Sequence, residues 1–375
     1  MKNASFTEKL GCILFFGALA LTSTMYLLSG GKEYSALEKR YLAPAPTLSA
    51  ESLFSGSFAD ETESFMADHM PARDALVGAV AYYDLLSGRQ NTKEILRGAD
   101  GRLFERPTVW DGRKAEENIA AIRAFGEKTG LRADLMLVPS AGYVLRGDVP
   151  GLHDKYEDGE HIARCYAMAQ GDIGCIDLTG PFCAAEDKEE LYYSTDHHWT
   201  SRGAWTAGGI YLQSKGRAIS PQESYKITVS PLFHGSTYAR SALWLTPGED
   251  VQLWDCGGDF TVRNSESDEE HDGLFYTERL AEDDRYTVFL DGNHALVRIE
   301  NGDPRAEGKL LVIRDSFSNC LGGFLAEGYK TVVLADLRYY KLPLSELCAQ
   351  EGFDDVLVVC SLGNFLGESG LEWLD

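Results

Sequence analysis

The sequence is poor in basic residues and lacks the common metal-site patterns. Only 35 Lys and Arg stand against 58 Asp and Glu, which gives a formal net charge of −23. A field of this sign repels nucleic acid and anionic lipid headgroups, so we expect no nucleic-acid partner. No two of the eight cysteines form a Cys-x-x-Cys pair, and no His-Glu-x-x-His run occurs. We therefore predict neither a structural metal site nor a cofactor.

An internal repeat of fixed period is absent as well, which excludes a solenoid or propeller. The 375 residues are 44% apolar and 11% aromatic, so the chain can bury a core of one large domain or two ordinary ones. Spacing alone does not give a disulfide pairing for the cysteines, of which an odd number, seven, follow Cys12.

Charged residues are missing from positions 10–31, and a helix over this run would be about 33 Å long, enough to span a bilayer. The alternative is a cleaved signal peptide, because Ala18 and Ala20 form an A-x-A-like pair. Cleavage there would leave apolar residues 25–28 at the mature end, so we expect an uncleaved, single-pass anchor over residues 1–31. The short N-terminal flank favours an extracytoplasmic body attached to the cell membrane.

The rest of the chain divides by pattern into a stalk with short helices, 32–92, and a catalytic domain, 93–375. In the second part, helical and strand patterns alternate, interrupted by a mostly β insertion at about 220–305. Continuous apolar runs favour an α/β fold with a parallel sheet covered on both faces. We predict helices at 113–129, 161–169 and 201–215, and strands at 134–138, 173–178, 310–313, 331–334 and 356–359.

In a parallel sheet, functional residues follow the carboxyl ends of strands. Ser316 comes directly after the predicted strand 310–313 and before a helical pattern. A strand, a sharp turn and a helix expose a nucleophilic serine and direct helix amides at a developing oxyanion. We therefore predict Ser316 as the nucleophile; the alternative is that it only caps the helix.

The segment Asp196-His197-His198-Trp199 precedes the predicted helix 201–215. In an extended chain, residues two apart point to the same side, so Asp196 can orient and charge-stabilise the imidazole of His198. His197 and Trp199 are then expected to face away. This spacing predicts His198 as the general base and His197 as a structural or substrate-contacting residue.

A competing interpretation is a catalytic zinc ion held by Asp196, His197 and His198 together with His294 or His234. Adjacent histidines rarely converge on one metal without a bent backbone, so we favour the serine interpretation.

A third segment ends the predicted strand 356–359 with Gly363-Asn364. The Asn364 amide can donate a hydrogen bond to an oxyanion beside Ser316, although Gly-Asn is also an ordinary turn signal. Arg338, after the strand 331–334, is a further candidate for the site. The predicted oxyanion- or substrate-binding residues are Asn364, Gly363, Asp315, Arg338, His197 and Trp199.

With these segments in place, the sequence resembles the DHHW family, named for the run 196–199, and through it the SGNH-like alginate O-acetyltransferases. The resemblance covers most of the exported body. It implies a three-layer α/β/α, flavodoxin-like fold in which the acid and base precede the nucleophile. Asn364 then falls where the oxyanion asparagine is expected. One departure is Arg314, which stands where a glycine would precede Asp315. The supporting stretches are residues 38–44, 101–105, 137–140, 195–201 and 314–319.

The resulting hypothesis is serine-dependent acetyl transfer to a hydroxyl of a cell-surface polysaccharide. The resemblance implies a multispanning membrane acyltransferase as the supplier of the acyl group. An acetylesterase with the same triad and a non-catalytic glycan-binding scaffold are the alternatives. Aromatic side chains can stack on sugar faces, and the tryptophans considered for this role are Trp199, Trp205, Trp244 and Trp254.

Overall fold

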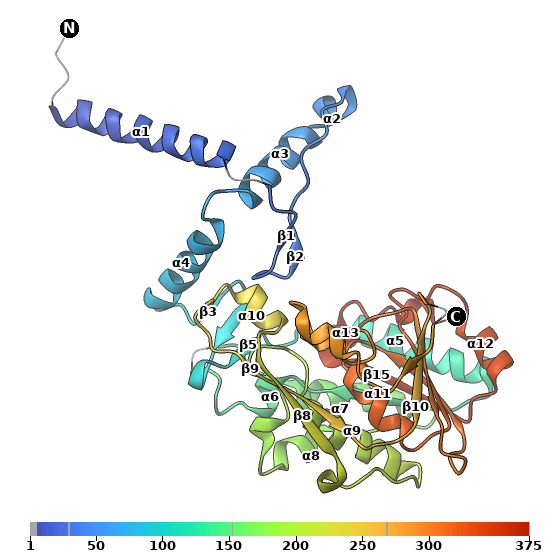
Figure 1. The fold of residues 1–375 in the computed structure, drawn as a ribbon. Coiled ribbons are helices and arrows are strands. Elements are labelled where there is room, and N and C mark those ends of the chain that lie inside the picture. The colour runs from blue at the N-terminus through green and yellow to red at the C-terminus, as the bar shows by residue number, and fades with distance from the viewer. Residues whose placement is uncertain (1–5, 29–30, 152, 268, 375) are drawn as a thin grey trace. The chain divides into compact units, whose positions relative to one another are not determined.

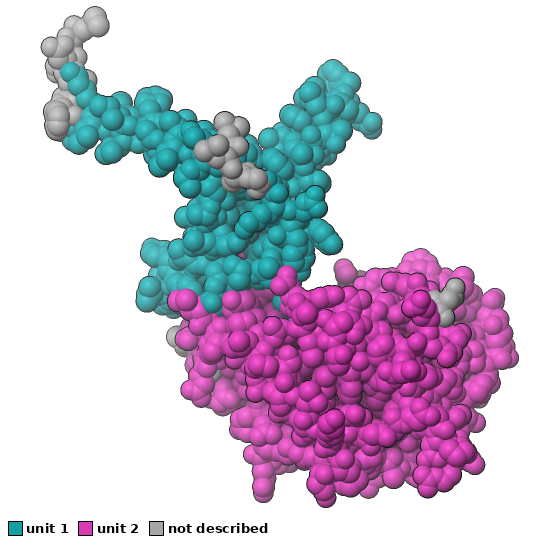
Figure 2. Space-filling model, viewed as in Figure 1, with its two compact units in different colours: residues 1–89, 242–244 teal, residues 90–241, 245–375 magenta. Residues whose placement is uncertain are grey.

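The computed structural model describes residues 6–28, 31–151, 153–267 and 269–374. The chain forms two compact units, coloured separately in Figure 2. One contains Met1–Arg89 with Ala242–Trp244, and the other contains Gln90–Ser241 with Leu245–Asp375. The division into anchor, stalk and catalytic domain at residues 31 and 92 stays a prediction.

The first unit begins with helix α1, Phe6–Leu28. Its segment Lys9–Tyr26 is long and apolar enough to cross a membrane, by length and composition alone. A membrane anchor and a signal sequence share these properties. The expected ends of the anchor, residues 1–5 and 29–30, lie outside the described residues.

The rest of the first unit is a short hairpin followed by three helices. Arg40 pairs with Asp68 at 2.5 Å, and Arg73 pairs with Glu38 at 2.9 Å, which ties the hairpin to the helices. Ser49 caps the first of these helices through a reciprocal hydrogen bond with Ser52. The elements are β1 Tyr34–Ser35, β2 Arg40–Tyr41, α2 Ala50–Ser55, α3 Ser57–Asp68 and α4 Arg73–Leu86.

The second unit is built on an eight-stranded sheet with the order β11-β10-β12-β14-β13-β15-β6-β7. Two of its strands, β10 and β15, are labelled in Figure 1. The strands from β14 to β7 run parallel, and β12, β10 and β11 are antiparallel to their neighbours. Their bounds are β6 Ala133–Val138, β7 Gly174–Cys175, β10 Phe260–Asn264, β11 His271–Asp272, β12 Leu296–Asn301, β13 Lys309–Arg314, β14 Thr331–Ala335 and β15 Asp355–Ser361.

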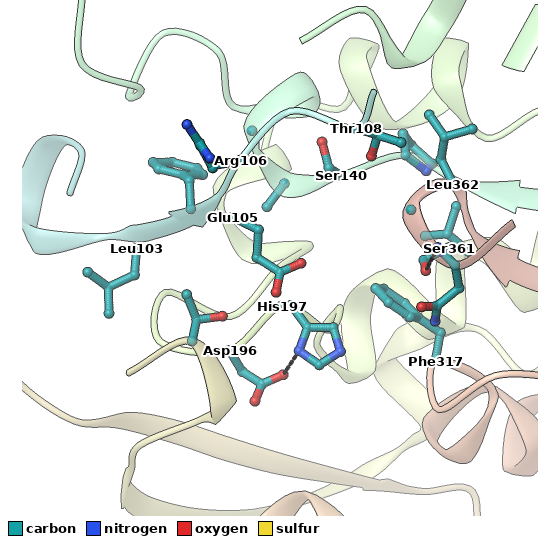
Figure 3. Close-up of a pocket in the computed structure, with 18 of the residues that line it drawn as sticks. Leu103, Glu105, Arg106, Thr108, Ser140, Asp196, His197, Phe317, Ser361 and Leu362 are labelled. Atoms are coloured by element: carbon teal, nitrogen blue, oxygen red, sulfur yellow. Dashed lines mark hydrogen bonds and ion pairs between the residues drawn. The ribbon is translucent and has the colours of Figure 1, made fainter. Parts of the chain in front are cut away.

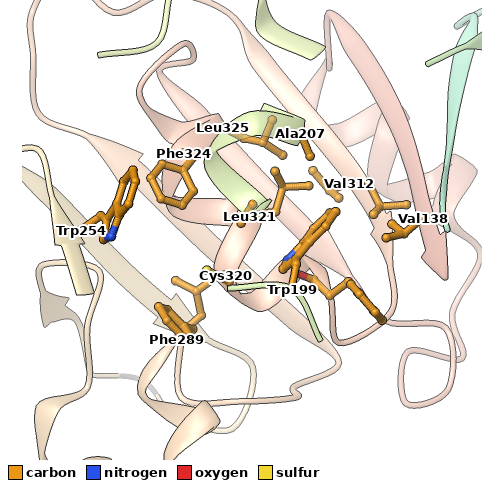
Figure 4. Packing of buried hydrophobic residues seen from close by; sticks show 14 of the residues in the cluster. Val138, Trp199, Ala207, Trp254, Phe289, Val312, Cys320, Leu321, Phe324 and Leu325 are labelled. Carbon is orange, nitrogen blue, oxygen red and sulfur yellow. The ribbon is translucent and has the colours of Figure 1, made fainter. Parts of the chain in front are cut away.

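Each central strand buries both of its faces. In β13, Leu310 and Val312 belong to one apolar core, while Leu311 and Ile313 belong to the other, because side chains alternate along a strand. Figure 4 labels Val312, Leu321 and Phe324, which all belong to the first core. Helices α9 Ser201–Ser214 and α11 Ser318–Ala326 cover that face, and α5 Gly112–Thr129, α7 Asp158–Ala169, α12 Leu344–Glu351 and α13 Leu362–Leu366 cover the other. The predicted three-layer α/β/α class is confirmed.

Shorter elements surround these layers. The helices are α6 Ala141–Val144, α8 Thr179–Ala184 and α10 Ser236–Ser241. The outer strands are β3 Asn91–Thr92, β4 Ile95–Arg97, β5 Leu103–Glu105, β8 Lys226–Phe233 and β9 Glu249–Asp255. The 3-10 turns are η1 Ala99–Gly101, η2 Lys188–Glu190, η3 Gln222–Ser224, η4 Thr277–Ala281, η5 Arg285–Val288 and η6 Leu371–Trp373.

Two details differ from the sequence prediction. The strand expected at 173–178 is reduced to the two residues of β7 at the sheet edge. The insertion at 220–305 is rich in strands but is not wholly separate, because β10 and β12 continue the main sheet beside β14. An antiparallel pair needs no crossover helix, so an alternation of helical and strand patterns does not predict this extension of the sheet. The eight cysteines, all within the described residues, are free thiols.

The register of the parallel strands brings three chain segments to one edge. Arg314 of β13 pairs with Val359 of β15, and Ser361 of β15 pairs with Val138 of β6. The carboxyl ends of these strands therefore lie side by side. The residues that follow them form the site described next.

Candidate active site

The acid–base loop, residues 194–199, is a bend rather than an extended strand. The buried Asp196 side chain organises it. Its Oδ1 accepts the backbone N–H of His198 at 2.9 Å, and its Oδ2 accepts the N–H of Ser236 at 2.6 Å. The first contact is an Asx turn, in which an aspartate satisfies an amide two residues ahead. The second ties the loop to α10.

Two further residues hold this loop. The Glu249 carboxylate accepts the N–H groups of Ser194 and Thr195, each at 2.6 Å. Burial raises the pKa of Glu249, while these hydrogen bonds act in the opposite direction. Gly235 passes so close that a Cβ built there would lie 2.2 Å from the Cβ of Asp196. Only glycine fits at position 235 with Asp196 where it is.

The nucleophile turn, residues 314–319, joins β13 to α11. Asp315 is buried within it and accepts the N–H of Phe317 at 3.1 Å through Oδ1. Its Oδ2 accepts the backbone N–H of Ser361 and the side-chain amide of Asn364, both at 2.8 Å. This carboxylate therefore fixes the turn to the end of β15, and it leaves Ser316 partly exposed.

The two segments meet through His198. Its Nδ1 lies 2.5 Å from Asp196 Oδ1, and its Nε2 lies 2.7 Å from Ser316 Oγ. With the Nδ1 proton donated to the carboxylate, Nε2 is the acceptor for the serine hydroxyl. Burial acts to raise the pKa of Asp196, but the two histidines and the hydrogen bonds from His198 and Ser236 hold it well below its usual value. The acid thus stays ionised beside the imidazole.

His197 does not face away from this group, contrary to expectation. Its ring lies 3.8 Å from the His198 ring, and its Nδ1 lies 2.7 Å from Ser236 Oγ and 3.6 Å from Asp196 Oδ1. The bend made by the Asx turn replaces the extended geometry on which the expectation rested. Burial, with a smaller contribution from His198, lowers the pKa of His197.

Tyr286 was not foreseen as part of the site. Its ring stacks on the His198 ring with centroids 4.0 Å apart and an interplanar angle of 7°. It comes from η5, deep in the insertion. No local motif marks Tyr286 in the sequence, since only the fold brings it to the histidine.

A cavity of about 430 Å³ opens beside Asp196 and His197 (Figure 3). Phe317 lies at its wall, one residue after Ser316. Polar and charged groups supply much of the remaining surface. The lining residues are Glu94, Leu103, Phe104, Glu105, Arg106, Thr108, Val138, Pro139, Ser140, Ala141, Gly142, Asp196, His197, Thr237, Arg240, Phe317, Ser361, Leu362, Gly363 and Asn364.

The structure separates the predicted oxyanion and substrate residues into two groups. Gly363 and Asn364 line the cavity, together with His197. Asp315 instead serves the turn with both oxygens, as described above. Asp315 and Arg338 do not line the cavity. The Arg338 guanidinium donates to the buried Asp336 carboxylate at 2.6 Å and 2.9 Å.

The predicted sugar-stacking role is wrong for Trp199 and Trp254, and it stays a prediction for Trp205 and Trp244, which are partly exposed. Trp199 and Trp254 are 0% and 4% exposed, so neither can stack on a ligand. Figure 4 shows Trp199 among the buried side chains of the first core. Its indole N–H donates to the Phe317 carbonyl at 3.0 Å, which supports the nucleophile turn from the core. Trp205 donates to the Ser220 carbonyl, and Trp244 belongs to the first unit.

Of the residues named in the zinc interpretation, Asp196, His197 and His198 come together in the structure. Ligand atoms of Asp196, His197 and His198 lie within 4.8 Å of one another. The additional histidines do not join them, since His234 contacts the Thr246 carbonyl and His294 contacts Asp291.

Comparisons with known proteins give the same fold. The crystal structure of a DHHW family protein from Eubacterium siraeum matches with a TM-score of 0.63 at 20% identity, over 75% of this chain and 96% of that chain. Bacillus cereus PatB1 with a sulfonyl adduct matches with a TM-score of 0.63 at 22% identity, over 75% of this chain and 98% of that chain. No curated protein matches the sequence significantly. The model of the DHHW family matches residues 171–335, and the resemblance of this chain to the DHHW family is thereby confirmed.

Proposed function

We propose that the protein is an extracytoplasmic serine O-acyltransferase that moves an acetyl group to a hydroxyl of a cell-surface polysaccharide. The observation that supports this most directly is the continuous contact from Asp196 through His198 to the Ser316 hydroxyl, at 2.5 Å and 2.7 Å. A hydroxyl, an imidazole and a carboxylate in this order form the arrangement that activates a serine nucleophile. The cavity of about 430 Å³ is lined by Asp196 and by Phe317, the residue after Ser316, and it has room for a substrate.

In the first half-reaction, Ser316 Oγ attacks the acetyl carbonyl of the donor while His198 Nε2 takes the hydroxyl proton. The tetrahedral intermediate collapses, the bond to the leaving group breaks, and His198 returns the proton to that group. Acetyl-Ser316 remains. Asp196 stabilises the imidazolium that exists between these steps.

In the second half-reaction, a sugar hydroxyl gives its proton to His198 and attacks the acetyl-serine carbonyl. The ester to Ser316 breaks, and His198 protonates the departing serine oxygen. The donors that we assign to the oxyanion are the Ser316 N–H and the second N–H of the Asn364 side-chain amide, the one that Asp315 does not accept. Water in place of the sugar would make the same site an esterase, so exclusion of water from the cavity decides the outcome.

The proposed location places α1 in the cell membrane with the second unit outside the cytoplasm. The polysaccharide would then be the acceptor at the cell surface. The acyl donor would be supplied by a multispanning membrane acyltransferase, as the family resemblance implies.

The test is covalent labelling of the full chain with a fluorophosphonate. The wild type and a Ser224→Ala control, which removes an exposed serine outside the site, are expected to be labelled. Ser316→Ala is expected to lose the label completely. Because the Bacillus cereus structure holds a sulfonyl adduct, a sulfonyl fluoride is a suitable second probe. Persistent labelling of Ser316→Ala would assign the nucleophile elsewhere.

Acetyl transfer from an activated acetyl ester to a polysaccharide, measured against hydrolysis in the same reaction, separates transferase from esterase. A wild type that binds polysaccharide but accepts neither label nor acetyl group would instead favour the scaffold alternative.

A further inference from the structure

The segment 286–294, in the insertion, contacts both the acid–base loop and the nucleophile turn. Tyr286 stacks face to face on His198, as described above, and its hydroxyl lies 3.5 Å from the backbone oxygen of Ser316. Tyr286 is almost completely buried, with 4% of its surface exposed. One face of the imidazole is therefore covered by a dry aromatic ring.

Two tethers fix the far end of this segment to the nucleophile turn. Arg314 donates to the His294 carbonyl at 3.3 Å, and Asn319 donates its side-chain amide to Asn293 Oδ1 at 3.1 Å. Arg314 also contacts the Asn319 side-chain oxygen, so the two tethers are joined. Arg314 is the residue that stands in place of the expected glycine, and here it connects the insertion to the turn.

The segment has a backbone shape that needs such support. Leu290 and Asp291 have φ angles of 54° and 62°, in the left-handed region that costs a non-glycine residue about 1 kcal/mol or more. Asp291 is held in place by Arg279, whose Nε donates to its Oδ1 at 2.6 Å. These contacts fix the residues that follow Tyr286, and the Tyr286 ring itself packs edge-on against Tyr193 and Phe289, with centroids 6.4 Å and 5.3 Å apart.

We infer that Tyr286 is a positioning residue, which holds the His198 ring in the plane needed to reach Ser316 and stabilises its cationic form. The inference rests on the proposed function. When His198 takes the serine proton it becomes an imidazolium, and the negative face of an aromatic ring attracts a cation stacked on it, most strongly in a desolvated site. The insertion thereby acquires a role in the reaction.

Other charged and titratable groups also surround this ring pair. Asp196 favours the imidazolium from the acid–base loop, and His197, whose pKa burial lowers, adds a second ring on that loop. Asp315, Tyr193 and Cys320 lie near Tyr286 and act on it electrostatically. Burial raises the pKa of Tyr286 well above its usual value, so the phenol stays neutral.

The test compares Tyr286→Leu, which removes the ring, with Tyr286→Phe, which keeps it. The Leu variant is expected to lower kcat/KM for an acetyl ester by about threefold to thirtyfold. It should also move the acidic limb of the pH–rate profile to lower pH, because the imidazolium loses a stabilising partner. The Phe variant should keep both the rate and the profile.

A matched control is present in the same insertion. Tyr276 stacks on His271 with centroids 3.8 Å apart, whereas the described rings that contact His198 are those of His197, Tyr286 and Phe317. Tyr276→Leu removes an equivalent stack and is expected to leave the pH–rate profile in place, even if it lowers the melting temperature. Should Tyr286→Leu fail to fold, Tyr286→Met replaces it, since methionine fills irregular gaps without an aromatic face.

An unchanged profile in Tyr286→Leu, or an equal loss in Tyr286→Phe, would overturn the inference. Failure of the proposed function looks different, because the wild type itself would then resist the fluorophosphonate.

Discussion

The acid–base loop and the nucleophile turn are built around the same local device. In each, a buried aspartate accepts the N–H two residues ahead, from His198 in one and from Phe317 in the other. In each, the second carboxylate oxygen accepts an amide from another chain segment. The difference is that Asp196 also holds an imidazole, whereas Asp315 holds the side-chain amide of Asn364.

Formation of the turn and ordering of the base are therefore separable roles of a buried aspartate. Asp315 shapes the backbone that presents the nucleophile, and Asp196 shapes its backbone and in addition orders a base. A substitution of Asp196 should therefore mainly lower activity, whereas a substitution of Asp315 should mainly lower stability.

Asp196→Asn is expected to lower kcat/KM by about 10³ to 10⁴, because an amide that donates to Nδ1 selects the wrong imidazole tautomer. Turnover of an acetyl ester and the rate of fluorophosphonate labelling measure the loss. Asp303→Asn, at an aspartate bonded mainly within its own loop, is the control. Activity of Asp196→Asn within a few-fold of the wild type would show that the carboxylate does not order the base.

Gly235→Ala is expected to lower kcat/KM by about 10², since a displacement near 1 Å in a catalytic group costs this much. The new Cβ would meet Asp196 Oδ2 at 2.3 Å and push the acid away from His198. Gly209→Ala in α9, where the nearest atom would be 3.4 Å away, is the matched control with unchanged activity. Equal activity of the two variants would mean that the loop tolerates displacement.

Asp315→Asn is expected to reduce the free energy of unfolding by about 1–3 kcal/mol, because an amide group would face a buried N–H donor and leave it unsatisfied. Urea denaturation measures the loss. The decrease in kcat/KM should be much smaller than in Asp196→Asn. A catalytic defect of equal size would remove the proposed difference between the two aspartates.

The smallest effect concerns acid stability. The pKa of the Asp196 carboxyl is lower in the folded chain than in the unfolded chain. At a pH between these two pKa values, folding therefore releases the proton of this carboxyl. The resulting stabilisation is complete above about pH 4 and is lost as pH falls further. Unfolding free energies measured below this pH should fall more steeply in the wild type than in Asp196→Asn, and parallel curves would contradict the assignment.

Much of this arrangement could be predicted from local patterns. The helix at 201–214 and the strands around 310–313 and 356–359 have strong periodic signals. Because parallel strands place their carboxyl ends together, the expected nearness of Ser316 and Asn364 needed no further information.

What could not be predicted depends on partners far along the chain. The bend that turns His197 inward is held by the Ser236 amide, 40 positions after Asp196. Trp199 is buried by the nucleophile turn, whose Phe317 carbonyl lies 118 positions away. Polar spacing gives no information about such contacts, and the sugar-stacking role assigned to Trp199 failed for this reason.

The bond between His198 and Ser316 also spans 118 positions, so it closes a long loop. Because closing a loop of this length is entropically unfavourable, we expect this contact to form after the local helices and strands. Recovery of serine reactivity after dilution from denaturant would therefore lag behind recovery of the circular dichroism signal. The reactivity of Ser316 would then report when the segment that carries His198 packs against the nucleophile turn during folding.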